Sequence, residues 1–406
     1  MKSFSKIFIL LFLFVALFGC EQKPITQGGE NTGGEEDIFI PSDSYIYFNV
    51  DPLTRGELIP SGTFLGDFNV LGYNYQGRWE AAVTTASQTT PIKDNVPMGV
   101  FYSSNISAKK GVQLVTYNET EKKHEYTYEG SDKSDVGNQK EWDGALRYSF
   151  FAWHPTDLEI IEVNGGNVNY FGEPYISYSI DGKTRAEMVD VITACKIDVT
   201  KFNGSSVNFN MEHRLAALDI LANSIITMKS LKEAHPEINF ANEGISDNAR
   251  ITVEDITALT LKLDKIKKNV SIPLNTSGTT MSLTAEGELT DVIYNDFDCT
   301  NISIPYYSTA DDMKTLMGDN KLILIPQAED INASLVISYD VVCTDGGNEY
   351  RIHYDRGNLE ELETTIKGLQ EKHYHYLELT FTASGVFLQA KVNESWIPLR
   401  VDYEFE

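Results

Sequence analysis

The chain has few cysteines and little positive charge for its 406 residues. It contains four cysteines, of which Cys20 lies near the N-terminus and Cys195, Cys299 and Cys343 lie far apart in the sequence. Three scattered cysteines can form at most one bridge, which excludes a disulfide framework. We expect these three to be small, buried apolar side chains.

Positive charge is scarce because Lys and Arg number 33 against 59 Asp and Glu, which gives a formal net charge of −26. Loss of Lys2 and Lys6 with an N-terminal signal would take that charge from −26 to −28. Binding to phosphates needs a cationic face, so this charge excludes nucleic acid as a partner. The acidity fits solubility at a crowded surface, and no acidic loop of the EF-hand kind is present.

Familiar catalytic and metal-binding motifs are also missing. The sequence has no Gly-x-Ser-x-Gly, His-Glu-x-x-His or paired Cys-x-x-Cys, which removes the common hydrolase and zinc signatures. His373 and His375 would share one face of a strand, but no third ligand can be named. We therefore expect edge histidines with ordinary hydrogen-bond partners and no metal site. We therefore predict a protein that is not an enzyme and that has no cofactor and no metal.

The N-terminus has the features of a lipoprotein signal peptide over residues 1–19. Lys2 and Lys6 flank the start of an uninterrupted apolar run, residues 7–18, which is shorter than the roughly 20 residues that span a bilayer. Gly19 and Cys20 supply the small residue and the thiol that lipoprotein signal peptidase requires. We expect Cys20 to be acylated and to anchor the chain stably to the outer membrane.

Residues 20–37 predict a flexible tether, because they are rich in glycine and acidic or amide residues and contain almost nothing apolar. Acidic residues just after the lipid are similar to the export signals of surface-displayed lipoproteins in some Gram-negative anaerobes. The tether therefore favours a location at the cell surface.

Short segments of alternating hydrophobicity, separated by Gly and Asn turns, make up most of the remaining chain and predict antiparallel sheets. Turn sequences at 345–348 and 164–167 each indicate a hairpin. The expected strands are 45–50, 68–75, 113–117, 146–153, 158–163, 168–171, 175–180, 206–211, 215–221, 258–263, 321–325, 334–343, 349–354, 374–381 and 386–392.

Helices are predicted to be few and short. Apolar residues at helical spacing predict one helix over 359–369, and residues 313–317 suggest a second, shorter turn. Residues 227–250 are polar and predict a long surface excursion. The expected fold is all-β and mostly antiparallel, with sandwich domains at 38–212 and 213–406.

The last ten residues, 397–406, alternate strictly between apolar and other side chains. The apolar set is Ile397, Leu399, Val401, Tyr403 and Phe405. Such a segment is suited to donation as a strand to a partner, where every second side chain would fill a core pocket. An ordinary internal last strand has the same pattern, so both interpretations stay open.

Scattered signatures recur along most of the chain in a consistent order: the lipoprotein signal, Leu53-Thr54-Arg55, the segment 68–75 with Trp79, the segment 147–155, Met211-Glu212-His213-Arg214-Leu215, Leu324-Ile325-Pro326-Gln327 and the segment 392–396. Taken together they resemble the fimbrillins, which build adhesive fimbriae on Gram-negative anaerobes of the mouth and gut.

This resemblance implies two transthyretin-like β-sandwich domains, export as a lipoprotein, and assembly with other fimbrial subunits by strand exchange. A trypsin-like protease would cut after Arg55, the first strand would leave, and a partner's terminal strand would fill the groove. Arg55 is equally compatible with an ordinary polar loop residue. A stalk, tip or anchor position and the adhesion ligand stay open, and a monomeric surface glycan-binding lipoprotein is the alternative function.

Overall fold

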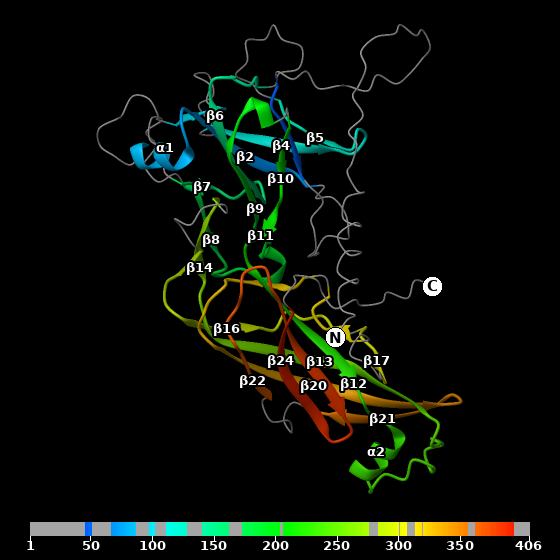
Figure 1. The fold of residues 1–406 in the computed structure, drawn as a ribbon. Helices are drawn as coiled ribbons and strands as arrows, with labels where there is room; N and C mark the ends of the chain where they lie inside the picture. The colour runs from blue at the N-terminus through cyan, green and yellow to red at the C-terminus, as the bar shows by residue number, and fades with distance from the viewer. Residues whose placement is uncertain are drawn as a thin grey trace, which may run out of the picture. The chain divides into compact units, whose positions relative to one another are not determined.

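The computed structural model describes residues 45–50, 66–86, 97–101, 111–127, 140–161, 173–203, 206–275, 283–299, 301–306, 313–318, 320–355 and 362–393 (Figure 1). The chain divides into two units, Met1–Pro41 and Ser42–Glu406, and every described residue belongs to the second unit. Within these ranges, no helix combines the length and the apolar character needed to cross a membrane.

Two sheets form the N-terminal part of the described unit. In the first, β1 (Tyr47–Val50) pairs in parallel with β10 (Ser206–Phe209). The second is antiparallel, and its strands in spatial order are β11 (Glu212–His213), β9 (Ile192–Val199), β6 (Arg147–His154), β2 (Phe68–Tyr75), β4 (Val112–Asn118) and β5 (Lys123–Glu125), with β3 (Met98–Gly99) also on β2.

An aromatic core joins these two sheets. Phe48 of β1 lies 5.3 Å from Phe150 of β6, measured between ring centroids, and Phe68 of β2 lies 5.9 Å from Phe209 of β10. All four side chains are buried. β1 and β10 alternate between buried and outward residues, which is the side-chain period of two of a half-buried strand, whereas β2 and β6 are buried on both faces.

Two other sheets form the C-terminal part. One contains β18 (Lys314–Thr315), β12 (Ala216–Ser224), β23 (Tyr374–Thr382) and β24 (Gly385–Asn393), with β19 (Leu322–Leu324) on β12. The other contains β16 (Thr290–Tyr294), β13 (Arg250–Ile266), β20 (Ile331–Asp345) and β21 (Asn348–Tyr354), with β17 (Ile304–Pro305) on β13 and β22 (Leu362–Ile366) on β20. They pack face to face, with the rings of Tyr339 and Phe381 4.7 Å apart.

A further sheet combines strands that precede residue 212, the expected domain boundary, with strands that follow it. Its strands in spatial order are β15 (Thr284–Glu286), β14 (Asn269–Pro273), β8 (Tyr175–Ser179) and β7 (Ile160–Ile161), and β14 pairs with β8 over five residues of each strand. Arg185 strengthens the same junction, because its Nη1 donates to the carbonyl oxygens of Met317 and Asn320. The division into domains at 38–212 and 213–406 remains a prediction.

The all-β, mostly antiparallel class expected from the sequence is confirmed. The segment expected at 68–75 coincides with β2, and those at 334–343 and 349–354 lie within β20 and β21. The hairpin between β20 and β21 turns at Gly346 and Gly347, whose φ angles of 53° and 99° lie in the left-handed region that glycine adopts without strain. The second expected hairpin, at 164–167, lies outside the described residues.

The helix expected over 359–369 is wrong. Residues 362–366 form β22, which pairs antiparallel with β20 from Leu335 to Ile331. Leu362 and Ile366 are four residues apart, and a separation of four places two side chains on one face of a strand as well as of a helix. Periodicity therefore could not separate the two structures, and pairing with β20 decided between them.

The shorter turn expected at 313–317 is also wrong, because Lys314 and Thr315 form β18 on the edge of β12. The α-helices of the described ranges are α1 (Trp79–Ala86) and α2 (Met228–Ala234). There are also two short 3-10 turns, η1 (Arg185–Glu187) and η2 (Lys201–Asn203). α2 begins in the expected surface excursion, where Thr227 accepts a hydrogen bond from the backbone N–H of Ser230.

Cys195, Cys299 and Cys343 are free thiols. Cys299 and Cys343 are buried, as expected, and burial raises the pKa of each thiol to about 11. Cys195 is half-buried. In this state Cys299 and Cys343 act as small apolar side chains.

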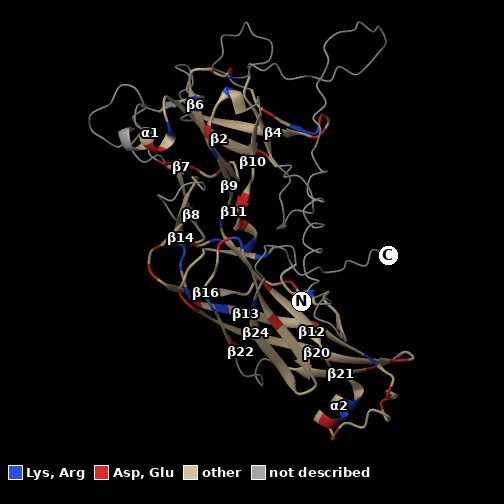
Figure 2. Ribbon diagram, in the orientation of Figure 1, with Lys and Arg blue, Asp and Glu red and all other residues tan. Residues whose placement is uncertain are grey.

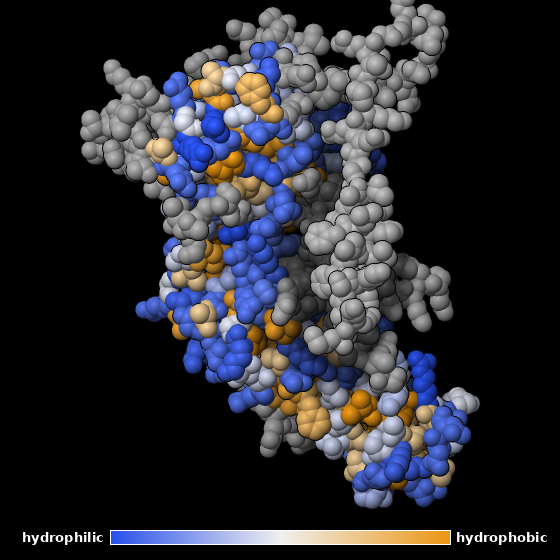
Figure 3. Space-filling view, in the orientation of Figure 1, coloured by the Kyte–Doolittle hydropathy of each residue, from blue (hydrophilic) through white to orange (hydrophobic). Residues whose placement is uncertain are grey.

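Charged residues of both signs are interspersed over the strands and loops in Figure 2, and basic residues do not gather on one face in that view. Apolar and polar groups are likewise intermixed on the face drawn in Figure 3. Among the residues that the structure describes, the exposed large apolar side chains are Leu114, Ile161, Phe202, Ile225, Leu289, Ile293, Tyr306, Phe387 and Val392.

Candidate functional site

The candidate site is the groove that holds β1. Ile46, Phe48 and Val50 point into the N-terminal core with exposed fractions of 0%, 1% and 6%, whereas Asn49 points outward. Each inward side chain fills a place in the core that the other strands leave open. We call this set of places, with the residues that line it, the β1 groove.

Within the β1 groove, aromatic side chains surround Phe48. The Phe48 ring lies 5.3 Å from Tyr126, 5.8 Å from Phe209 and 6.1 Å from Phe101, measured between ring centroids. Aromatic pairs at these separations add stabilisation to that of burial. The pocket is thus shaped for a large, flat side chain.

The main chain of β1 is held mainly along one edge. Its only strand partner in the described part of the chain is β10, over four residues in parallel register. Before β1, the backbone N–H of Ile46 donates to the carbonyl oxygen of Lys140 at 2.8 Å, and Tyr45 forms an isolated bridge with Glu141. β1 is therefore a short strand with large apolar anchors and few backbone bonds.

The residues that the sequence singled out for processing and exchange lie outside the described residues. These residues are Cys20, Arg55 and the apolar set of the C-terminal strand: Ile397, Leu399, Val401, Tyr403 and Phe405. The described part of β1 ends at Val50, five positions before Arg55, and β24 ends at Asn393. The roles of these residues stay predictions.

Sequence reasoning missed the groove walls. Phe150 lies in the segment 146–153, which the sequence predicted as a strand without indicating what its side chains contact. Tyr126 and Phe101 gave no signal, because each stands outside the segments expected to be strands. Only the folded chain brings them to Phe48.

The two histidines of the C-terminal sheet each have a hydrogen-bond partner in the backbone. His375 accepts a hydrogen bond from the backbone N–H of Gln370 at 3.3 Å, and His373 Nδ1 donates to the carbonyl oxygen of Glu371 at 2.7 Å. Their ring centroids are 6.5 Å apart. Nowhere in the described ranges do three His, Cys, Asp or Glu side chains gather as metal ligands would.

His375 should make the chain less stable in acid. Burial, with a smaller contribution from His373, lowers the pKa of His375 from 6.5 to about 4. The unfolded chain therefore binds this proton more readily, so stability is complete above pH 6.5 and is lost as the pH falls towards 4. The loss is roughly 3 kcal/mol.

Urea unfolding of the wild type and a His375→Gln variant at pH 7, 6, 5 and 4 measures this effect. The difference in unfolding free energy between the two proteins should change by roughly 3 kcal/mol in favour of the variant between pH 7 and pH 4. His353→Gln is the control, because an exposed hydrogen bond to Asp340 raises the pKa of His353 and gives the opposite sign. A wild type and His375→Gln variant with parallel pH profiles would contradict the prediction.

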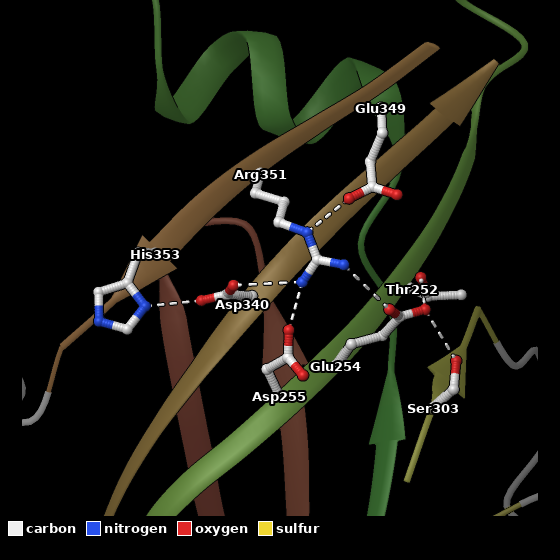
Figure 4. Close-up of polar contacts among 8 residues, drawn as sticks. All are labelled: Thr252, Glu254, Asp255, Ser303, Asp340, Glu349, Arg351 and His353. Carbon is white, nitrogen blue, oxygen red and sulfur yellow. Dashed lines mark hydrogen bonds and ion pairs between the residues drawn. The ribbon is translucent and has the colours of Figure 1, made fainter. Parts of the chain in front are cut away.

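A charged cluster lies on the outer face of the C-terminal sheet (Figure 4). Arg351 of β21 contacts four carboxylates, those of Glu254, Asp255, Asp340 and Glu349. Its Nε donates to Glu349 at 2.6 Å, and Asp340 also accepts from Nδ1 of His353 at 2.6 Å. The hydrogen bond to Glu349, with a smaller contribution from the one to Asp255, raises the pKa of Arg351.

The cluster braces neighbouring strands, because its carboxylates come from β13, β20 and β21. Its carboxylates already share one guanidinium group, and an exposed network of this kind contributes little to stability for each pair. The cluster therefore links neighbouring strands at the surface of the sheet, and we assign it no role in ligand binding.

Neither a family model nor a curated protein sequence matches the chain. A solved structure of a fimbrial protein from Bacteroides vulgatus matches with a TM-score of 0.51 and 17% identity, covering 87% of this chain and 100% of the other. The chain has the fold of that fimbrial protein. The fimbrillin resemblance drawn from the sequence is thus supported at the level of fold.

Two proposed cell adhesion proteins of known structure also match this chain, with lower scores. The protein from Bacteroides uniformis is 13% identical with a TM-score of 0.41 and covers 88% of this chain and 100% of its own. The protein from Bacteroides ovatus is 14% identical with a TM-score of 0.39 and covers 87% of this chain and 97% of its own.

Proposed function

We propose that the chain is a fimbrial subunit of the cell surface that acts in adhesion and has no catalytic role. The fold shared with a fimbrial protein supports this proposal. The observation that carries it is β1, a four-residue strand with deeply buried apolar anchors and a single described strand partner. A strand held in this way leaves a ready-made acceptor groove when it departs.

Assembly proceeds by strand exchange in this proposal. A trypsin-like protease cuts after Arg55, β1 dissociates, and the alternating segment 397–406 of another subunit enters the β1 groove. Main-chain bonds to β10 supply affinity that is independent of sequence, and every second side chain enters a core pocket. Other fimbrial subunits are therefore the partners, as a homopolymer or a heteropolymer.

Export takes the lipoprotein route in this proposal. Acylated Cys20 anchors the chain to the outer membrane through the tether 20–37, and the cut after Arg55 removes the lipid, the tether and β1 together. Anchoring then delivers the subunit to the surface, and cleavage permits assembly. A subunit that keeps Arg55 uncut would form the base of a fibre.

Arg-specific proteolysis tests the proposed assembly. Treatment of the purified protein, produced from residue 21 onward, should give a new N-terminus at Gly56 and ladders that resist denaturation on a gel. The matched control is Arg55→Lys, which keeps the positive charge but is not a substrate for an Arg-specific protease. It should stay monomeric.

A second variant separates donation of the last strand from an internal role. Deletion of 397–406 should leave a folded monomer that is cut after Arg55 but forms no ladder. Loss of the folded monomer on deletion would favour an internal strand. An uncut, stable monomer that binds polysaccharide would instead support a glycan-binding lipoprotein.

A further inference from the structure

The hydroxyl of Tyr126 closes a ring of three hydrogen bonds at the start of β1. The backbone N–H of Ile46 donates to Lys140 O at 2.8 Å, and Tyr126 Oη donates to Ile46 O at 2.7 Å. The backbone N–H of Lys140 donates to Tyr126 Oη at 3.2 Å. The backbone N–H and carbonyl groups of Ile46 and Lys140 that face each other therefore all have hydrogen-bond partners.

This ring replaces one bond of an antiparallel ladder. Opposed residues of a hydrogen-bonded antiparallel pair exchange two N–H to carbonyl bonds directly. Here the bond from Ile46 to Lys140 is direct, whereas the return bond from Lys140 to Ile46 passes through the Tyr126 hydroxyl. The adjacent bridge between Tyr45 and Glu141 is antiparallel, as such a ladder requires.

The position of the Tyr126 hydroxyl is fixed by the groove. Tyr126 is 6% exposed, and its ring lies 5.3 Å from Phe48 and 6.1 Å from Phe101. Phe101 lies outside β1, so it would continue to pack against Tyr126 after β1 departs. The Tyr126 hydroxyl and the backbone of Lys140 would then be in position to form hydrogen bonds with the main chain of a new strand.

We infer that Tyr126 sets the register of whichever strand occupies the β1 groove, by binding the main chain of one residue at the position of Ile46. The inference rests on the proposed function, because it concerns the same groove. Only one residue of an incoming strand can form main-chain hydrogen bonds to both Tyr126 and Lys140. Once that residue is in place, every second side chain after it enters one of the pockets that Phe48 and Val50 occupy.

The contact defines the chemistry of the partner. The incoming segment must be extended, must carry apolar side chains at every second position, and must present a free N–H at the position of Ile46, which excludes proline there. In the segment 397–406 the single proline, Pro398, is not one of the alternating apolar residues. All members of its apolar set keep their backbone N–H.

Hydrogen exchange of the uncut protein tests the role of Tyr126 without any need for assembly. Tyr126→Phe removes only the hydroxyl and keeps the ring packing on Phe48 and Phe101. Exchange of the amides in 45–50 and 140–142 should become about tenfold faster, since two main-chain groups lose their partner. Exchange in β12 is the internal reference for intact folding, and Tyr117→Phe on β4 is the matched variant that should change nothing. Equal exchange of 45–50 in Tyr126→Phe and wild type would overturn the inference.

Cleavage then separates this inference from the proposed function. After the cut at Arg55, the fragment that contains β1 should dissociate about tenfold faster from Tyr126→Phe than from wild type, with a synthetic peptide of residues 397–406 as competitor. Equal release rates would overturn the inference. Failure of the peptide to displace the fragment from either protein would overturn strand exchange, and the exchange data would still decide the role of Tyr126.

Discussion

Replacing Phe48 by alanine is expected to lower the free energy of unfolding by about 3 to 5 kcal/mol. The ring is 1% exposed and is surrounded by Phe101, Tyr126, Phe150 and Phe209, so its removal leaves a cavity that rigid aromatic neighbours cannot fill. The expected loss lies at the upper end for core truncations because both burial and aromatic contacts disappear.

Urea unfolding followed by tryptophan fluorescence measures the Phe48 effect, because Trp142 lies in the same core, 6.1 Å from Phe150 between ring centroids. Phe202→Ala is the matched control, since Phe202 is 90% exposed and its truncation should change the free energy by less than about 0.5 kcal/mol. A Phe48→Ala variant as stable as Phe202→Ala would show that β1 does not contribute to the core.

Replacing Lys321 by methionine is expected to destabilise the C-terminal sheets by about 3 to 5 kcal/mol. Lys321 Nζ lies 2.6 Å from Asp219 Oδ2, and the two side chains are 8% and 1% exposed. Tyr374 also donates to Asp219, at 2.5 Å. Removing the lysine would leave a carboxylate deep in the protein with no cation beside it.

A double-mutant cycle tests this explanation. Asp219→Asn combined with Lys321→Met removes both charges and should recover much of the stability that Lys321→Met loses, because a neutral amide is less costly to bury. Lys367→Met is the control, since Lys367 pairs with Asp330 at the surface, with 78% of its side chain exposed, and should change the stability by less than about 1 kcal/mol. Additive losses in the double variant would contradict the role assigned to the pair.

The two sets of residues differ in their relation to the proposed function. Phe48 and Tyr126 belong to the β1 groove, so under the proposed strand exchange changes there would affect both the stability of the monomer and the binding of a partner strand. Asp219 and Lys321 are adjacent in sequence to Leu218 and Leu322, which belong to a different hydrophobic cluster from the one that contains Phe48 and Tyr126. Comparing variants of Phe48 and Tyr126 with variants of Lys321 and Asp219 therefore distinguishes a defect in the proposed assembly from a defect in folding.

The alternating pattern of apolar residues by itself determined that the chain is all-β and where many strands lie. β2 could be predicted because it is a short run rich in apolar and aromatic residues, and the hairpin of β20 and β21 because its strands alternate on either side of a glycine turn. The same pattern failed at 362–366, where a spacing of four residues fits a helix and a strand alike.

Only the tertiary structure decided what surrounds each inward side chain. β1 pairs with β10, more than 150 positions further along the chain, and Tyr126 meets Ile46 through a hydroxyl that no sequence motif predicts. Lys321 and Asp219 likewise gave no signal, although they form a buried ion pair. Local sequence determines the conformation and the facing of a strand, whereas its neighbours depend on long-range packing, and the β1 groove consists entirely of such neighbours.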